Sequence, residues 1–582
     1  MQALSRIHSN LRNDIFLRDV SQDTYTIFST VYAWWIRLLG LRDAALALAV
    51  TFKVCFFLAA WAMARAFFDS RTSFLAVASL IVLTGAYGAY GVFHFAEDWL
   101  TARSLGEALV ITACALHFRG FRLAGLLVAS TALFVHPLMA LPGLLLLLCL
   151  QAPPLVSTLV LGTGVLATLA VSLYSILSPA SAHFLSIIDT EWLQVVRERS
   201  QFLFLQLWSV SDWQLNARAF LSLTLSWVAL GQPRVRNLCI SCMLVGAAGL
   251  MIALIGGSIG PVAILVQAQC WRWVWLGVFV SIALLLPTSL RIWEDRRCGI
   301  FCATLLCSAW IIPPAYGSWC LACSLAVWLA RDRVNSPFAL VLRCAGFAVA
   351  ALTAGWLFQS TFATAASGES LNRLASGAVV ATVLAAWSLS VRVEAQRSWT
   401  VWSVCAGVFL TIAVVALPRA LHDAGMDGTA AEIDEFADWR SAIPPDSNVF
   451  VVSVKNAPTF AWFTLQRPSY LTVDQSSGVV FSRATALEVR RRSQVLLPLI
   501  DPDWTLLSNM KTKNIGSGGT SSSISRPVTR DRLYSLCGDP QLNFVVAREN
   551  VGFSPDRHTS PGPWRDWNLY DCRRVRAPLT AP

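Results

Sequence analysis

The sequence predicts a mainly α-helical protein: a polytopic bundle of about 12 to 14 transmembrane helices followed by a small extracytoplasmic α/β domain. Two observations predict the bundle. Of the 582 residues, 55% are hydrophobic and only 14% are charged, and the mean hydropathy is +0.57, so the chain is too apolar for one soluble core. A sharp change of composition after Pro418 predicts the separate domain.

Apolar runs of helical length recur from residue 43 to residue 418. Several are shorter than the roughly 20 residues that cross a bilayer, so we expect the pairs divided at His136-Pro137 and Pro313-Pro314 to be bent or re-entrant. The predicted spans are 43–66, 73–93, 104–118, 123–136, 137–151, 154–178, 212–231, 238–258, 271–291, 299–314, 316–330, 336–358, 374–391 and 399–418.

Arginine-rich gaps between the spans predict the topology. Successive gaps of this kind are separated by two spans or a multiple of two, and they contain FRGFR (118–122), QPRVR (232–236), RIWEDRR (291–297), ARDR (330–333) and VRVEAQR (391–397). Short cytoplasmic loops collect Lys and Arg, so these gaps are predicted to lie inside. Both the N-terminal segment 1–42 and the domain 419–582 are then predicted to lie outside.

The outside position of residues 1–42 requires a means of export. No charged region, apolar core and cleavage site of a signal peptide precede Asp14. Either the amphipathic stretch 24–40 assists insertion, or a further transmembrane helix precedes this sequence, and we favour the second alternative.

The formal net charge of +11 does not indicate nucleic-acid binding. From Arg419 onward the chain has 19 Lys and Arg against 17 Asp and Glu, and the preceding part has 26 against 17. The basic excess therefore lies mostly in the membrane part, where the predicted cytoplasmic loops explain it. The sequence contains no P-loop and no GxGxxG motif after a predicted strand, so it does not indicate a nucleotide-driven protein.

The part after Pro418 reads as a small α/β domain. Strands are predicted at 448–454, 469–473 and 542–547, helices at 432–442 and 483–499, and a Gly/Ser-rich loop at 516–525. Cys537 and Cys572 are the only two of the 15 cysteines in this part. In an oxidising compartment they are predicted to form a disulfide.

Two predicted outer loops contain clustered carboxylates. NDIFLRD places Asp14 and Asp19 before the span at 43, and FHFAEDWLTAR places Glu97, Asp98 and Arg103 before the span at 104. Acids on neighbouring outer loops, with an arginine, can hold an acceptor hydroxyl together with a divalent cation or a phosphate. Each cluster alone is also typical of a solvated loop.

Further ionisable residues lie near the predicted outer surface. Arg103 and Glu107 are spaced i, i+4, which suits either an intrahelical pair or a functional site near the hydrocarbon. His136 before Pro137 suits a kink or a phosphate ligand. Arg272, in QAQCWRWVWL, suits an interfacial aromatic belt or a phosphate clamp. The loop 179–211 suggests an interfacial amphipathic helix with Glu191, Arg197, Glu198 and Arg199.

In these motifs, in ALFVHPLMALP, and in a helical bundle with an α/β tail, the chain resembles the GT-C superfamily of membrane glycosyltransferases, in particular an uncharacterised bacterial branch. The resemblance implies transfer of a sugar from a polyprenyl-phosphate donor, at the outer face of the bacterial inner membrane, to an envelope glycan, lipid or protein. It implies Asp19, or less favourably Asp14, as general base, and Glu97 and Asp98 as ligands of the acceptor or of Mg²⁺ or Mn²⁺.

The chemistry that this resemblance implies is an inverting displacement, in which a cation or Arg103, His136 and Arg272 would stabilise the leaving phosphate. A transporter or flippase of lipid-linked glycans, or a non-catalytic scaffold, are the alternative functions. A transporter would more naturally show broken helices in matched halves, which this sequence does not clearly show.

Overall fold

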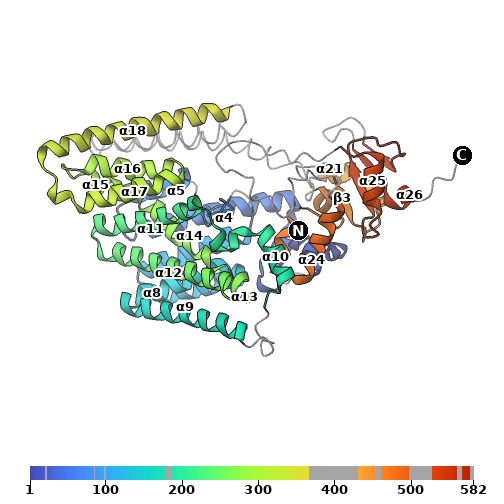
Figure 1. The fold of residues 1–582 in the computed structure, drawn as a ribbon, viewed down its shortest axis with the longest axis horizontal. Helices are drawn as coiled ribbons and strands as arrows, with labels where there is room; N and C mark the ends of the chain where they lie inside the picture. Colours follow the sequence, from blue (N-terminus) through green and yellow to red (C-terminus); the bar gives the residue numbers. More distant parts are fainter. Residues whose placement is uncertain are drawn as a thin grey trace.

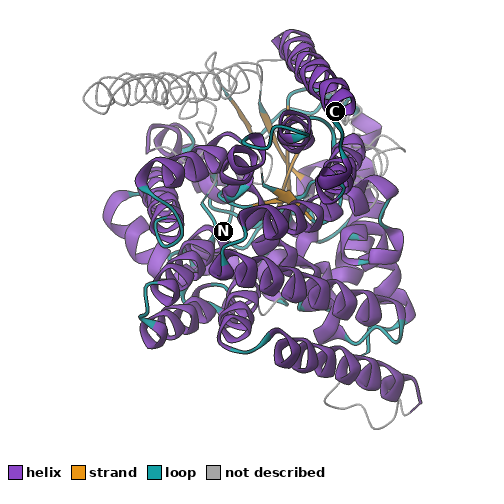
Figure 2. Cartoon of the chain, turned by 90° about the vertical axis from the view of Figure 1, so that its left-hand side faces the viewer, coloured by secondary structure: helices purple, strands orange, loops and turns teal. Residues whose placement is uncertain are grey.

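The computed structural model describes residues 1–19, 22–83, 85–97, 100–177, 187–365, 430–452, 460–472, 474–496, 527–559 and 567–576. The predicted spans 374–391 and 399–418, the loop 516–525 and Asp98 lie outside these residues. The described chain is mainly helical, as predicted, and Figure 2 shows the helices gathered into one bundle.

Helices account for most of the described residues before Ala430 (Figure 1). In chain order they are α1 (Gln2–Ser5), α2 (Ile15–Arg18), α3 (Phe28–Leu39), α4 (Leu41–Ala64), α5 (Ser70–Val82), α6 (Ala102–Phe118), α7 (Arg122–Val135), α8 (Pro137–Gln151), α9 (Pro154–Leu177), α10 (Thr190–Arg199), α11 (Val210–Leu230), α12 (Pro233–Ser258), α13 (Ala263–Gln267), α14 (Val274–Ala283), α15 (Leu285–Trp293), α16 (Gly299–Ile311), α17 (Pro314–Leu329) and α18 (Ser336–Ala365).

Several of these helices could cross a membrane. Within the described ranges, five helical stretches are long and apolar enough: α4, α9, α12, Ala263–Ala283 and the first 22 residues of α18. Five more apolar helices, α5, α7, α8, α16 and α17, are shorter. The short helices include both pairs that the sequence predicts to be divided by proline, because α8 begins at Pro137 and α17 at Pro314.

The predicted span 73–93 is wrong in its second half. Helix α5 ends at Val82, and β1 (Ala86–Tyr87) then pairs antiparallel with β2 (Phe93–His94), which sets Tyr87 opposite Phe93. Gly88, between the two strands, has φ +78°, and a Cβ there would lie 2.1 Å from the ring of Trp271. The glycines of GAYGAYG therefore allow a tight hairpin where apolar composition alone suggests a continuous helix.

The part after Ala430 contains a four-stranded mixed sheet. Strand β3 (Val449–Val451) runs parallel to β4 (Phe544–Ala547), β4 is antiparallel to β6 (Asn568–Asp571), and β6 is antiparallel to β5 (Arg557–His558). The predicted strand 469–473 contributes only a bridge between Ser469 and Val449. The helices of this part are α21 (Ala430–Glu435), α22 (Ala437–Ala442), α24 (Arg483–Leu496), α25 (Arg530–Cys537) and α26 (Cys572–Arg576).

The tail, defined here as the described residues from Ala430 onward, lies at one end of the bundle beside α10 (Figure 1). Trp192 of α10 donates its indole N–H to the carbonyl of Val479 at 2.7 Å, and Arg483 of α24 forms an ion pair with Asp189 at 2.5 Å. The apolar face of α10 is buried inside the protein. The helix that the sequence predicts in this loop is therefore present, and it packs against the tail.

Cys537 at the end of α25 and Cys572 at the start of α26 form a disulfide, as the sequence predicts. The bridge joins residues 35 positions apart. On the chain-entropy model, its loss should destabilise the tail by about 3–4 kcal/mol, because the unfolded loop gains freedom.

Peptide-resolved alkylation of unreduced, denatured protein tests this pairing. Cys537 and Cys572 should stay unlabelled until a reductant is added. The unpaired Cys55, Cys323 and Cys344 should label at once and act as internal controls. Ready labelling of the pair in unreduced protein would contradict the bridge.

Candidate functional site

The β1–β2 hairpin is held rigidly against α11. Asn216 accepts a hydrogen bond from the amide of Gly88 at 3.0 Å and donates one to its carbonyl at 2.7 Å. Asp212, in the first turn of α11, accepts from the amide of Tyr90 at 2.8 Å. Two polar side chains of one helix thus fix the loop that positions Phe93 inside the protein.

Two arginine side chains converge on Phe93. The guanidinium of Arg272 lies 4.0 Å from the centre of the ring, and that of Arg103 lies 4.8 Å from it. Arg272 comes from the 3₁₀ turn Cys270–Trp273, which precedes α14, and only 7% of its surface is exposed. It is therefore not an arginine that reaches outward from an interfacial belt, and the cation–π contact is made away from water.

Arg103 forms its ion pair with Glu97, at 2.9 Å, and not along the helix with Glu107. The second oxygen of Glu97 accepts from the Thr101 hydroxyl at 3.1 Å. Glu107, which is 1% exposed, accepts from the amide of Ala96 at 2.9 Å. The two acids thus order the residues that lead into α6. Glu97 balances the charge of Arg103, and neither acid forms an ion pair with Arg272 in the described structure.

His136 lies in the break between α7 and α8, where Pro137 begins the second helix. The kink that the sequence predicts is therefore present. The imidazole is buried within electrostatic range of Arg272 and Arg103. The role of His136 as a phosphate ligand stays a prediction.

Several buried polar atoms of this region have no hydrogen-bond partner among the described residues. They are the Tyr87 hydroxyl, Arg103 Nη1, Glu107 Oε1, His136 Nδ1 and Arg272 Nε. Of these atoms, the Tyr87 hydroxyl, Arg103 Nη1 and Arg272 Nε are donors. Unpaired buried donors are costly, and the presence of three in one region favours an anionic ligand. We call Tyr87, Phe93, Glu97, Arg103, Glu107, His136 and Arg272 the arginine cluster.

The donors of the arginine cluster do not suit a divalent cation. No group of three His, Cys, Asp or Glu that could hold a metal occurs in the described part of the chain. Glu97 is engaged by Arg103 and Thr101, and the nearby arginines repel a cation. Asp98, the other predicted ligand, lies outside the described residues.

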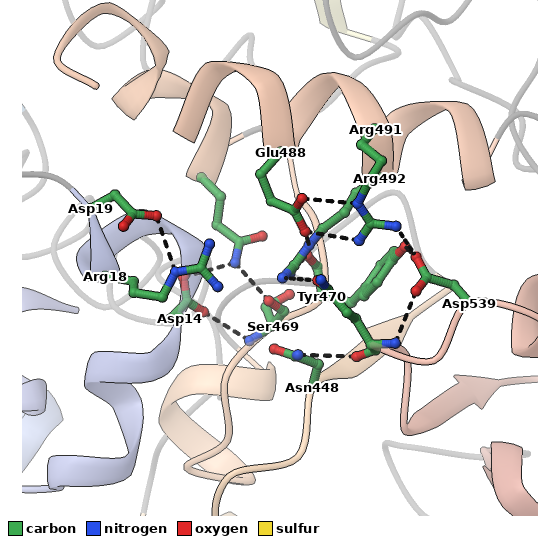
Figure 3. Close-up of polar contacts among 12 residues, drawn as sticks. Asp14, Arg18, Asp19, Asn448, Ser469, Tyr470, Glu488, Arg491, Arg492 and Asp539 are labelled. Carbon is green, nitrogen blue, oxygen red and sulfur yellow. Dashed lines mark hydrogen bonds and ion pairs between the residues drawn. The ribbon is translucent and has the colours of Figure 1, made fainter. Parts of the chain in front are cut away.

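Asp14 has a structural setting different from that of a base in an open cavity. Its side chain caps α2 through the amide of Phe16 at 2.8 Å and accepts from Trp462 Nε1 at 2.7 Å and Gln475 Nε2 at 2.9 Å. It also accepts from the amide of Ser469 at 2.8 Å (Figure 3). Burial raises the pKa of Asp14, although all four hydrogen bonds act to lower it. Its carboxylate joins the N-terminal segment to the tail.

Asp19, at the end of α2, is the more open of the two aspartates. Its carboxylate is paired with Arg18 at 3.0 Å, and 29% of its side chain is exposed (Figure 3). A single neighbouring arginine leaves acceptor positions on both oxygens. The approach of Asp19 to Glu97 and Asp98 stays a prediction.

A buried ionic network supports the tail segment that binds Asp14 (Figure 3). Arg492, which is 1% exposed, donates to the carbonyl of Tyr470 at 2.6 Å and pairs with Glu488 at 2.8 Å. Arg491 pairs with Asp539 at 2.6 Å, and that carboxylate also accepts from the Tyr470 hydroxyl. Burial alone would raise the pKa of Asp539, but its hydrogen bonds outweigh burial and hold the pKa below its ordinary value.

The structure thus brings together Glu97, Arg103, His136 and Arg272, which the sequence predicts as site residues on separate segments. Tyr87 and Phe93 were not predicted, because they fall in an apolar run that reads as a span. The regular glycines of GAYGAYG are the signal that distinguishes this run from a helix.

Comparison with models of protein families, with curated proteins and with solved structures found no match to this chain.

Proposed function

We propose that the chain is an integral-membrane glycosyltransferase that transfers a sugar from a polyprenyl-phosphate donor to an extracytoplasmic acceptor in the bacterial envelope. The observation that carries the proposal is the arginine cluster, in which Arg103 and Arg272 meet at Phe93 with buried N–H groups unpaired. The sequence resemblance to GT-C enzymes supplies the sugar chemistry, and the cluster supplies a place for the phosphate.

In the proposed reaction, Asp19 accepts the proton of the acceptor hydroxyl as that oxygen attacks the anomeric carbon. The bond between that carbon and the phosphate oxygen breaks, and polyprenyl phosphate leaves with the bonding electron pair. Arg103 and Arg272 stabilise the negative charge that develops on this phosphate. Glu97 orients Arg103 through their ion pair.

The tail is proposed to be an extracytoplasmic α/β domain. The contacts of α10 and Asp14 with the tail support a position on the same side as the outer loops. If the predicted topology holds, reporter fusions after Arg419 and within 232–237 should give opposite compartment signals. Matching signals would overturn both the topology and the placement of the site.

The proposed reaction is tested in cells that carry the wild-type gene, a deletion, or the variant Asp19→Asn. The deletion and Asp19→Asn should each remove one sugar from an envelope glycan, lipid or protein and cause a polyprenyl-linked sugar to accumulate, both measured by mass spectrometry. Asp438→Asn, a matched change at an exposed position of the tail, should behave as the wild type.

Two outcomes would favour the alternative functions. Unchanged transfer in Asp19→Asn would argue against this residue as the base. Accumulation of the lipid-linked sugar on the cytoplasmic side alone would indicate a flippase, and unchanged glycans in the deletion strain would leave a scaffold.

A further inference from the structure

A second cationic site lies at the turn between α15 and α16. A pocket with an empty volume of about 450 Å³ opens there, and its lining includes Trp293, Arg296, Arg297 and Arg343. None of these residues belongs to the arginine cluster. The inference below is therefore independent of the proposed glycosyl transfer.

The turn has a defined shape. Asp295 accepts hydrogen bonds from the amides of Arg297 at 2.8 Å and Cys298 at 3.0 Å, which redirects the chain from α15 into α16. The Asp295 side chain thus accepts hydrogen bonds from two backbone amides that would otherwise bind water. These hydrogen bonds fix the backbone of the turn that lines the pocket.

Helix α18 completes the pocket by packing closely on α16. A Cβ at Gly346 would lie 3.0 Å from the Cα of Phe301, so the two backbones can approach only because this residue is glycine. Arg343 lies one turn earlier on α18. Its Nη2 donates to the carbonyl of Arg296 at 3.1 Å, which ties α18 to the turn.

The acidic residues of the pocket are already engaged. Glu294 is paired with Arg291 at 2.5 Å, and Asp295 is used by the turn. Arg297 lies 3.6 Å from the carboxylate of Asp332. Arg296 and Arg343 form no ion pair with any residue that the structure describes. The lining has three arginines against Glu294 and Asp295, so its net charge is +1, and Arg296 and Arg343 are the arginines of the pocket without a described carboxylate partner.

Helix α18 contributes Arg343 to the lining, and outside the pocket it exposes apolar side chains. Leu340 is 61% exposed, Val341 59% and Phe347 57%, and Trp293 on the other side is 48% exposed. Helix α18 is also one of the stretches able to cross a membrane. An occupant of this pocket is thus expected to present an anionic group to the arginines and hydrocarbon to the surrounding surface.

Helix α18 starts at the end of the bundle remote from the tail (Figure 1). Arg343, seven positions after the first residue of α18, lies near that end. On the predicted topology this is the cytoplasmic surface, where basic pockets between membrane helices bind anionic lipid headgroups.

We propose that this pocket binds the phosphate headgroup of an anionic phospholipid, with Arg296 and Arg343 as its cationic ligands. Trp293 lies at the interface beside the headgroup, and the acyl chains extend along α18. The bound lipid connects the α15–α16 turn to α18.

The test measures retention of phosphatidylglycerol by the full-length protein in nanodiscs of mixed phosphatidylglycerol and phosphatidylcholine, by native mass spectrometry. Arg343→Gln and Arg296→Gln should each weaken retention about fivefold, the effect of one cationic side chain near a lipid surface. Arg333→Gln, at an exposed arginine of the neighbouring α17–α18 turn that does not line the pocket, is the matched control and should retain lipid as the wild type does.

Thermal unfolding in detergent supplies a second measurement. Phosphatidylglycerol should raise the Tm of the wild type and of Arg333→Gln but not that of Arg343→Gln, and phosphatidylcholine should raise none of them. Equal lipid loss in all three variants would overturn the proposal, because it would indicate a diffuse effect of charge. Equal stabilisation of the wild type by inorganic phosphate would also overturn it, because the ligand would then be a free anion.

Discussion

Replacing Arg272 with glutamine should lower sugar transfer by about 100- to 1,000-fold, the typical cost of removing one donor that stabilises developing negative charge. Arg272 is buried, forms no ion pair with a described carboxylate, and leaves Nε unpaired at the centre of the arginine cluster. The same features predict that Arg272→Gln does not lower the Tm, because an uncompensated buried charge destabilises the protein that contains it.

A loss of transfer without a fall in Tm would distinguish a role in the reaction from a structural role. Arg236→Gln is the matched control, since Arg236 also lies over an aromatic ring, that of Trp227 at 4.8 Å, but outside the cluster. Transfer is measured with a labelled polyprenyl-phosphate sugar, and unfolding by a thermal scan of the same samples. Normal transfer by Arg272→Gln would contradict a role of Arg272 in the reaction, and a Tm that falls together with activity would indicate a structural role.

Replacing Asp14 with alanine should destabilise the attachment of the tail by about 3–5 kcal/mol, because buried donors lose a charged acceptor. The indole of Trp462 and the amide of Ser469 lie at the same oxygen, and Gln475 lies at the other. Asp14→Asn should destabilise the attachment of the tail almost as much. In either orientation of the new side chain, its amide nitrogen would face a hydrogen-bond donor.

Hydrogen exchange of the segments around Asp14 and Ser469 measures this effect. Both segments should exchange faster in Asp14→Ala, while the helices of the bundle keep their protection. Asp19→Asn is the matched control, because Asp19 is partly exposed and, among the described residues, is paired only with Arg18. Unchanged exchange in Asp14→Ala would contradict the structural role and restore Asp14 as a candidate base.

Local chemistry explains which parts of the candidate site were predictable. Arg103, His136 and Arg272 stand out in the sequence because ionisable residues are rare in apolar surroundings. Glu97 is visible for the same reason. Tyr87 and Phe93 are hydrophobic residues among others, and only the turn at Gly88 removes them from a helix. Their position in the site depends on a hairpin. The glycines that indicate this hairpin are a weaker signal than the high hydropathy of the surrounding residues, which indicates a helix.

The role of Asp14 could not have been predicted from the sequence. Both aspartates belong to the motif NDIFLRD, and both fall in the predicted extracytoplasmic segment 1–42. What separates them is a set of partners at Trp462, Ser469 and Gln475, which no periodicity or motif connects to residue 14. By contrast, α24 and the strands β3 and β4 follow from local patterns and lie where the sequence predicts them.

The contacts of Asp14 also set an order on the biosynthesis of the protein. Its side-chain partners in the tail follow it by 448 and 461 positions. At about 5–20 residues per second, a ribosome needs roughly 20 to 90 s to make the intervening chain. Throughout that interval the carboxylate of Asp14 has none of its partners in the tail, although Ala3, Leu4 and Leu11 can already pack against Ala33 and Ile36 of α3. A ribosome that stalls before Trp462 would release a chain in which Asp14 lacks both of these side-chain partners.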